Sequence, residues 1–247
     1  MSLPVGTHVL KDPEAVAREA PERIGELIEW GTAFDADAGA LVLGREGGHS
    51  HHRIVHALGD ATGREVMRAM IERTRRLGNT QVWSRCFTLD LLTHDGACRG
   101  ALVRDERHGM MLVWAKQTIL ATGGAGQLYR ESTNPPVATG DGMAAAYRAG
   151  AELRDMEFMQ FHPTVLYVAG SARYLVSEAV RGEGAVLLND RGTRFMPKRH
   201  KLAELAPRDI VAREIFREQM GGSRVWLDAT RMGRAFGRRF PGILALC

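Results

Sequence analysis

Residues 117–124 read QTILATGG, a short apolar run that ends in two glycines. A run of this kind is typical of a buried strand that enters a tight turn. At the carboxyl end of a strand in an open α/β sheet, glycines let the backbone approach a cofactor. Turns of this composition also occur in ordinary loops, so the cofactor interpretation depends on the surrounding sequence.

The sequence on either side of this run predicts strands before it and a helix after it. Strands are expected at 80–84, 87–94, 98–104 and 110–114. Asp95-Gly96 is a hairpin turn signal, so these strands should form an antiparallel meander. Farther along, Gly140-Asp141-Gly142 opens a helix that Gly150 closes. At the N-terminus of this helix, Asp141 would either cap the helix or contact a ligand.

Other helices and a domain boundary follow from apolar spacing. Helices are expected at 21–30, 60–77 and 206–220. Thr62, with Glu65 three residues later, has the spacing of a capping box. From Met156 onward the pattern changes to short strands and turns. We therefore expect an α/β (α+β) chain with a partial Rossmann-like domain at 1–155 and a second, α+β domain at 156–247.

The composition is that of a soluble globular protein. Hydrophobic residues make up 45% and charged residues 25%, and the net charge is +4 with basic and acidic residues interspersed. No basic stripe predicts nucleic-acid binding, and no apolar window is long enough to cross a membrane. Cys86, Cys98 and Cys247 have neither zinc-ligand nor disulfide spacing, so a reducing, cytoplasmic location fits best.

Chemically informative side chains gather after residue 156. The segment 160–164, QFHPT, contains His162, which is either a functional imidazole or a satisfied histidine beside a proline turn. Ser177-Glu178 and the following RGEG segment, 181–184, place a hydroxyl, two carboxylates and an Arg near glycines. Such a set suits an anion-binding loop or a charged surface turn. Arg208 stands in the first turn of an expected helix, where the dipole disfavours a cation, so we expect a functional reason for it.

A metal site is not expected. His49, His51, His52 and His56 include a His-x-His spacing that metal sites use. No acidic or cysteine partner nearby completes a ligand set, so we interpret these histidines as structural.

Seven ordered motifs resemble one flavoprotein family. They are ATGG, TNP, GDG, EFMQFHPT, SEAVRGEGA, GTRFM and APRDIVAR, collinear from about residue 21 to 247. The family contains L-aspartate oxidase and the flavoprotein subunits of succinate dehydrogenase and fumarate reductase. The resemblance implies a partial FAD-binding domain followed by a capping domain that holds the substrate. It covers the central part of the family's length, without the GxGxxG fingerprint and the later active-site residues, and residues 1 to about 12 do not resemble it.

Within this family, residues 45–53, REGGHSHHR, resemble L-aspartate oxidases more than the respiratory subunits. The resemblance implies that Glu46 orients the substrate's amino group. His162, Ser177 and Glu178 would hold a substrate carboxylate. Arg208 matches the family's proton-transfer position. A guanidinium gives up its proton reluctantly, so this role would need neighbouring carboxylates, for which Asp209 and Glu183 are candidates.

On the cofactor side, the resemblance implies that Phe87 and Thr88 contact the adenosine half of FAD. Ala121, Thr122, Gly123 and Gly124 would wrap the cofactor, and Asp141 would contact it directly. The implied reaction is oxidation of L-aspartate to iminoaspartate, with oxygen or fumarate as acceptor, in de novo NAD biosynthesis. A functional link to quinolinate synthase follows from it. The alternatives are a fumarate reductase or succinate dehydrogenase flavoprotein and a catalytically incomplete remnant.

Overall fold

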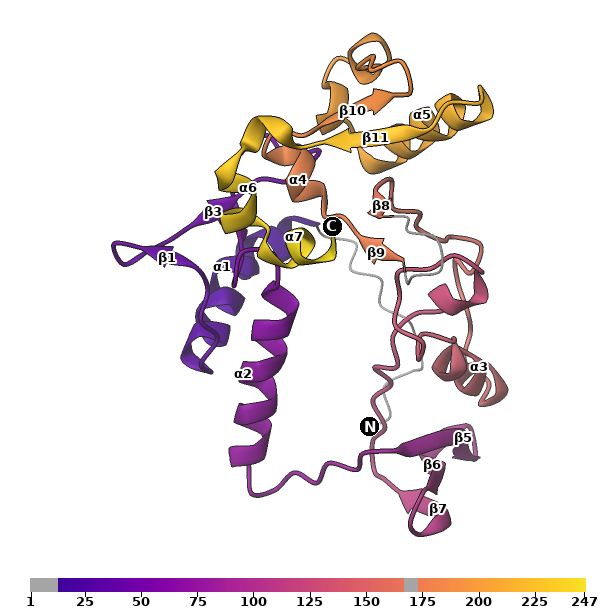
Figure 1. Ribbon diagram of the computed structural model, residues 1–247. Coiled ribbons are helices and arrows are strands. Elements are labelled where there is room, and N and C mark those ends of the chain that lie inside the picture. Colours follow the sequence, from indigo (N-terminus) through magenta and orange to yellow (C-terminus); the bar gives the residue numbers. More distant parts are fainter. Residues whose placement is uncertain (1–12, 167–172) are drawn as a thin grey trace. The chain divides into compact units, whose positions relative to one another are not determined.

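The computed structural model describes residues 13–166 and 173–247, and within it the chain forms two compact units (Figure 1). The central unit is Asn79–Met159, and the flanking unit combines Glu14–Gly78 with Gln160–Cys247. The residues before and after the central unit therefore fold together. We expected one domain before residue 155 and another after it. Because Glu14–Gly78 belongs to the same unit as the C-terminal part, this division of the chain stays a prediction.

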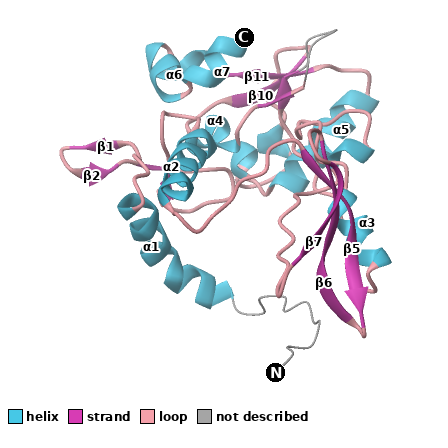
Figure 2. Ribbon diagram, turned by 90° about the horizontal axis from the view of Figure 1, so that it is seen from below, coloured by secondary structure: helices cyan, strands magenta, loops and turns pink. Residues whose placement is uncertain are grey.

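The central unit is built on an antiparallel meander (Figure 2). Its strands are β5 (Cys86–His94), β6 (Ala97–Asp105) and β7 (Gly109–Trp114), and its helices are η1 (Gly126–Leu128) and α3 (Asp141–Arg148). Asp95 and Gly96 have φ angles of 50° and 68°, as the turn between β5 and β6 requires. Three of the four strands of the predicted meander are thus confirmed, with ends within one residue of the prediction.

Gly100 allows β6 and β7 to pair closely. Its φ is +145°, and a Cβ atom there would overlap the carbonyl oxygen of Val113 on the neighbouring strand. Helix α3 lies against β5, where Arg148 donates to Asp90 Oδ2 at 3.0 Å and to the Leu89 carbonyl at 3.0 Å. These contacts fix α3, and the turn that precedes it, to the meander.

Two strands predicted in this unit are wrong. Residues 80–84 and 117–122 are extended or irregular without strand pairing, and Ile119 is 90% exposed. A buried strand must bond its backbone to neighbouring strands. All strand pairs in the described part of the chain are antiparallel, and none includes residues 117–122. The apolar run therefore lacks the partners that its composition led us to expect.

The flanking unit contains short strands and most of the helices. In chain order, its elements are α1 (Pro13–Glu29, one residue of which precedes the unit), β1 (Ala36–Asp37), β2 (Ala40–Leu41), β3 (Leu43–Gly44), β4 (Ile54–Val55), α2 (Thr62–Arg76), β8 (Val165–Leu166), β9 (Tyr174–Leu175), α4 (Glu178–Gly182), β10 (Val186–Asn189), η2 (Met196–Lys198), η3 (Ala203–Leu205), α5 (Arg208–Met220), β11 (Val225–Asp228), η4 (Thr230–Met232), α6 (Arg234–Arg239) and α7 (Pro241–Leu246). β3 pairs with β4 and β10 with β11, both antiparallel.

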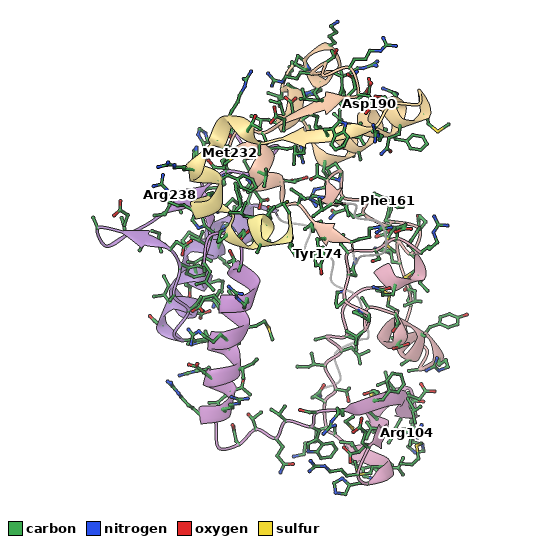
Figure 3. The ribbon with its side chains drawn as sticks, viewed as in Figure 1. Arg104, Phe161, Tyr174, Asp190, Met232 and Arg238 are labelled. Carbon is green, nitrogen blue, oxygen red and sulfur yellow. The ribbon has the colours of Figure 1, made fainter. Side chains whose placement is uncertain are left out.

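Two small apolar clusters form the core of this unit. One joins α4 to the C-terminal helices through Ala179, Val180, Ala185, Phe240 and Ile243. The other joins β10 to α5 through Leu187, Phe195, Met196, Ala206 and Val211. Asp190, labelled in Figure 3, closes the end of the β10–β11 pair by accepting from the Arg224 amide at 2.9 Å and the Trp226 indole at 3.2 Å. Helices α4 and α5 are thereby held by separate clusters on the same unit.

The helices predicted at 60–77 and 206–220 are confirmed as α2 and α5, with local corrections. Helix α1 begins at Pro13 and contains Pro21, which we expected at its start. The capping box predicted at Thr62 is wrong, because α2 has Ala61 at its N-cap position without a side-chain bond. Thr62 Oγ1 instead accepts from the Ala57 amide at 3.1 Å, and Glu65 accepts from the Ala33 amide at 2.8 Å. Both side chains therefore bond to backbone amides that lie before the helix rather than to amides of its first turn.

Candidate functional site

In the central unit, the turn at 121–124 packs against the start of α3. A Cβ atom on Gly142 would overlap the side chain of Thr122, and one on Gly140 would lie 3.1 Å from Ala125 Cβ. Gly123 has a φ of +77°, which glycine adopts at no steric cost. Two glycine-dependent segments thus lie in direct contact, and both carry residues that we predicted to bind the cofactor.

The predicted cofactor-binding residues of this unit are accessible. Residues 121–124 are exposed, as are Phe87 and Thr88 at the start of β5. Asp141 lies in the first turn of α3 and accepts from Thr139 Oγ1 at 2.6 Å, while Gly140 occupies the N-cap position. Exposed backbone beside a helix N-terminus fits the anionic and hydroxyl groups of a dinucleotide such as FAD. The roles of the individual residues stay predictions.

In the flanking unit, Glu178 lies between two guanidinium groups. Its Oε1 atom is 3.1 Å from Arg181 Nη2 and 3.2 Å from Arg208 Nε, and its Oε2 atom accepts from Arg208 Nη2 at 3.2 Å. The Glu178 side chain is 6% exposed, whereas that of Arg208 is 38% exposed. The buried carboxylate therefore fixes the Arg208 side chain and leaves part of its guanidinium accessible to a ligand.

Helix starts place both members of this pair. Ser177 is the N-cap of α4, and its Oγ atom accepts from the Ala179 amide at 3.2 Å. Pro207 takes the N-cap position of α5, so Arg208 is the first residue of that helix. At the start of a helix the dipole disfavours a cation. Arg208 is stabilised there by Glu178, which lies 30 residues earlier in the chain.

His162 belongs to the same electrostatic cluster. Burial lowers the pKa of its imidazole below the usual value, and the charges of Arg208 and Arg181 lower it further, against the opposing effects of the Thr164 backbone and Glu178. Nδ1 lies 3.0 Å from the Thr164 carbonyl oxygen and 3.2 Å from the Thr164 amide nitrogen. Either tautomer bonds to Thr164 through Nδ1, which leaves Nε2 as the nitrogen available to a ligand.

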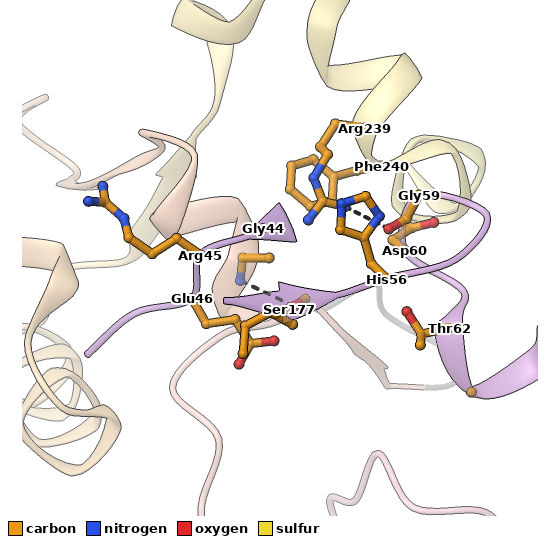
Figure 4. A pocket seen from close by; sticks show the side chains of 13 residues that line it. Gly44, Arg45, Glu46, His56, Gly59, Asp60, Thr62, Ser177, Arg239 and Phe240 are labelled. Carbon is orange, nitrogen blue, oxygen red and sulfur yellow. Dashed lines mark hydrogen bonds between the residues drawn. The ribbon is translucent and has the colours of Figure 1, made fainter. Parts of the chain in front are cut away.

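Glu46 and Ser177, more than a hundred residues apart, line one cavity of about 170 Å³. Figure 4 shows both side chains there together with His56 and Arg239. The loop that carries Glu46 is fixed by a bond from the Gly48 amide to the Leu205 carbonyl at 2.8 Å. The flanking unit therefore places Glu46 and Ser177 at one cavity, and Glu178, which follows Ser177 in the sequence, pairs with Arg208.

The carboxylates proposed from the sequence as partners of Arg208 are wrong. Asp209 bonds to Arg213 at 2.7 Å, and Glu183 lies 3.4 Å from Arg239. Arg181, which the predicted site omitted, is the second cation on Glu178. A carboxylate and an Arg three residues apart on a helix was the signal that could have revealed this pairing.

The histidine segment contains a structural pair. His56 Nδ1 lies 2.7 Å from Asp35 Oδ2, and Asp35 also accepts from the amides of Leu58 and Gly59 at 2.9 Å each. Among the described residues, no group of three or more His, Cys, Asp or Glu side chains could hold a metal ion. Within the same residues, no helix has the length and apolar character of a membrane span.

The family model described as "FAD binding domain" matches residues 13–247. Two relatives are the L-aspartate oxidase of Streptomyces coelicolor, 48% identical over 96% of this chain and 43% of its own length, and L-aspartate oxidase 2-a, chloroplastic, of Nicotiana tabacum, 48% identical over 94% and 38%. The chain spans less than half of the length of these curated relatives.

Solved structures give a consistent result. A mutant form of the E. coli quinol fumarate reductase is 31% identical with a TM-score of 0.85, over 93% of this chain and 42% of that one. A flavocytochrome c3 fumarate reductase in an open conformation is 29% identical with a TM-score of 0.58, over 81% and 35%. The fold of this chain therefore occurs in solved fumarate reductases.

Proposed function

Because this chain belongs to the FAD binding domain family of flavoproteins, we propose that it is part of an FAD-dependent L-aspartate oxidase. The reaction is oxidation of L-aspartate to iminoaspartate, with oxygen or fumarate as the electron acceptor, as the first step of de novo NAD biosynthesis. The flavoprotein fold and the FAD cofactor expected from the sequence are confirmed by the family match and by the relatives.

The observation that carries the proposal is the shared cavity of Glu46 and Ser177, beside the ion pair of Glu178 and Arg208. An amino dicarboxylic acid carries one cation and two anions. Glu46 supplies a carboxylate for the ammonium group. Ser177 and His162 supply hydrogen-bonding groups for a substrate carboxylate, and Arg208 adds a positive charge. The charges of the site thus complement those of L-aspartate.

The chemical step removes a hydride from the α-carbon and a proton from the nitrogen, which leaves a C=N double bond. FAD, when bound, supplies the acceptor for the hydride. The chain's own residues orient the α-carbon and move the proton. Glu46 holds the nitrogen, and Arg208 relays the proton: it takes one from the nitrogen as it passes one of its own to the Glu178 carboxylate, which lies 3.2 Å from Nη2.

A fumarate reductase or succinate dehydrogenase flavoprotein is the second candidate, favoured by the TM-score of 0.85 to the fumarate reductase. Succinate and fumarate carry no amino group. A carboxylate such as Glu46 in the cavity has no cationic group to pair with in either compound. The L-aspartate oxidase proposal therefore accounts for Glu46, and the alternative does not.

The deciding experiment uses the purified full-length protein that contains this chain. We expect a flavin absorbance spectrum and peroxide formation that depends on L-aspartate. Succinate should bind without being oxidised at a comparable rate. Oxidation of succinate with no turnover of L-aspartate would reject the proposal, and absence of bound FAD would favour a catalytically incomplete remnant.

Glu46→Gln separates recognition of the amino group from recognition of the carboxylates. The amide keeps the shape of the side chain but loses its charge, so KM for L-aspartate should rise. Succinate affinity should stay the same or improve. The cytoplasmic location and the link to quinolinate synthase stay predictions, and the tobacco relative is named as chloroplastic.

A further inference from the structure

The pair of His56 and Asp35 leaves one nitrogen of the imidazole ring without a bond. His56 is 6% exposed, and its Nδ1 atom lies 2.7 Å from Asp35 Oδ2. Its Nε2 atom is buried and has no hydrogen-bond partner among the residues that the structure describes. A buried polar atom without a partner costs free energy, so we looked for a ligand that could bond to it.

Asp35 determines where the proton of the ring lies. Burial raises the pKa of this carboxyl, but hydrogen bonds from the Gly59 amide, the His56 ring and a further amide outweigh that effect and hold the pKa below its usual value. Asp35 is therefore a carboxylate, which can only accept hydrogen bonds, so the ring proton belongs on Nδ1. In the neutral imidazole this leaves a lone pair on Nε2.

Nε2 lies on the cavity side of the ring. His56 lines the cavity of Glu46, whereas Asp35 does not, so the ring stands between Asp35 and the cavity (Figure 4). A Cβ atom on Gly44, which also lines the cavity, would lie 3.4 Å from Cδ2, the ring carbon bonded to Nε2. The edge of the ring that carries Nε2 therefore faces the cavity, where its lone pair can meet a ligand.

The other side-chain acceptors of the cavity wall are already bonded, except for Glu46. The Asp60 carboxylate accepts from two backbone amides of α7. Thr62 Oγ1 and Ser177 Oγ each accept from a backbone amide. The Glu46 carboxylate bonds to no residue in the described part of the chain. Glu46 and the Nε2 atom of His56 are thus the side-chain acceptors that the cavity leaves for a ligand.

We propose that His56 is a specificity-determining residue, which accepts a hydrogen bond from the ammonium group of the substrate through Nε2. This role rests on the proposed function, because it adds a second contact to the amino group that Glu46 recognises. An ammonium group carries three N–H donors that point in different directions. Glu46 supplies the opposite charge, and His56 supplies a neutral acceptor for a second N–H. Succinate has no such donor, so His56 distinguishes L-aspartate from succinate.

His56→Asn removes the acceptor and keeps the bond to Asp35, because the amide nitrogen of Asn lies close to the position of Nδ1. The experiment uses the purified full-length protein that contains this chain, with FAD bound. We expect KM for L-aspartate to rise about tenfold or more, the effect of losing a hydrogen bond to a charged group, with a smaller change in kcat. The dissociation constant of succinate, measured by perturbation of the flavin spectrum, should change less than about twofold.

His51→Asn is the matched control, because His51 is an exposed histidine of the same segment that does not line the cavity. It should leave both values unchanged.

His56→Gln and His56→Met separate the acceptor from the bulk of the side chain. The two replacements have similar volumes, but only Gln places a polar group near the position of Nε2. KM for L-aspartate should therefore be about tenfold lower in His56→Gln than in His56→Met, with equal succinate affinity. The thermal transition of each variant should be recorded. If His56→Asn does not fold, this second pair decides the question.

An unchanged KM for L-aspartate in His56→Asn would overturn the role of His56 and would assign Nε2 to an ordered water molecule. Equal losses for L-aspartate and succinate would also overturn it, as would equal KM values for L-aspartate in His56→Gln and His56→Met. Failure of the wild-type protein to oxidise L-aspartate would instead reject the proposed function, so the two failures are distinguishable.

Discussion

Gly142 at the start of α3 and Thr122 in the 121–124 turn are so close that a methyl group on Gly142 would overlap the Thr122 side chain. The helix N-terminus can approach the turn only because residue 142 has no side chain. Since predicted FAD-contacting residues lie on both segments, this one contact controls the shape of the predicted cofactor surface.

Gly142→Ala should weaken FAD binding. Overpacking of this kind costs about 1–3 kcal/mol, and displacement of the turn should lower FAD affinity by about tenfold or more. Fluorescence titration of the apoprotein with FAD measures the change. Gly25→Ala is the control and should leave FAD affinity intact. Wild-type affinity in Gly142→Ala would mean that the turn does not contact the cofactor.

Arg208→Ala should reduce kcat much more than it raises KM, because proton transfer typically contributes about 10²- to 10⁴-fold in rate. Steady-state kinetics with L-aspartate checks this. Arg213→Ala, on the same helix with a 61% exposed side chain, is the matched control and should be nearly silent. An effect of Arg208→Ala confined to KM would assign Arg208 to binding alone.

His162 should stay neutral at pH values somewhat lower than those at which a free histidine takes up its proton, because its pKa is lowered. Burial lowers its pKa, so between the unfolded value near 6.5 and the lower folded value, the unfolded chain binds more protons. The contribution of His162 to stability is therefore complete above pH 6.5 and is lost as pH falls through its folded pKa. Titration of the imidazole by NMR checks this, and a midpoint at or above 6.5 would contradict it.

Glu65 should contribute to acid resistance. Hydrogen bonds from Arg68 and then from the Ala33 amide hold its pKa at about 2. Its stabilising effect is present above the unfolded pKa, near 4.5, and is lost as pH falls towards 2. Glu65→Gln should lower the thermal midpoint at pH 7 and flatten the loss of stability between pH 5 and about 2.

Glu72→Gln is the control for this comparison, because Glu72 pairs with the same Arg68 but is 48% exposed. It should change the thermal midpoint little. Equal effects of the two variants would show that the buried bond from Glu65 to the Ala33 amide adds nothing.

Local sequence signals predicted the elements that depend on local forces. The Asp95-Gly96 turn predicted the antiparallel pairing of β5 and β6, and apolar spacing predicted α2 and α5. The capping box at Thr62 failed because Ala57 and Ala33 offered better partners than the helix's own amides. The run at 117–122 failed because a buried strand is defined by its neighbours rather than by its own residues.

The same distinction between local and tertiary interactions applies to the candidate site. Motifs predicted Glu46, Glu178 and Arg208 as site residues, since each lies in a distinctive sequence context. The partner of Arg208 could not be derived from adjacent residues. Helical geometry directs Asp209 to Arg213 four positions later, and tertiary packing brings Glu178 from 30 residues away.

The discontinuity of the flanking unit has a consequence for biosynthesis. The Asp60 carboxylate accepts from the amides of Gly242 and Ile243 at 3.0 Å and 2.8 Å, and Arg239 donates to the Gly59 carbonyl at 2.6 Å. These partners are synthesised roughly 10 to 40 s after Asp60 at ribosomal rates of about 5–20 residues per second. During translation the central unit can form first. The first described helices can complete their contacts only after the C-terminal helices have been synthesised.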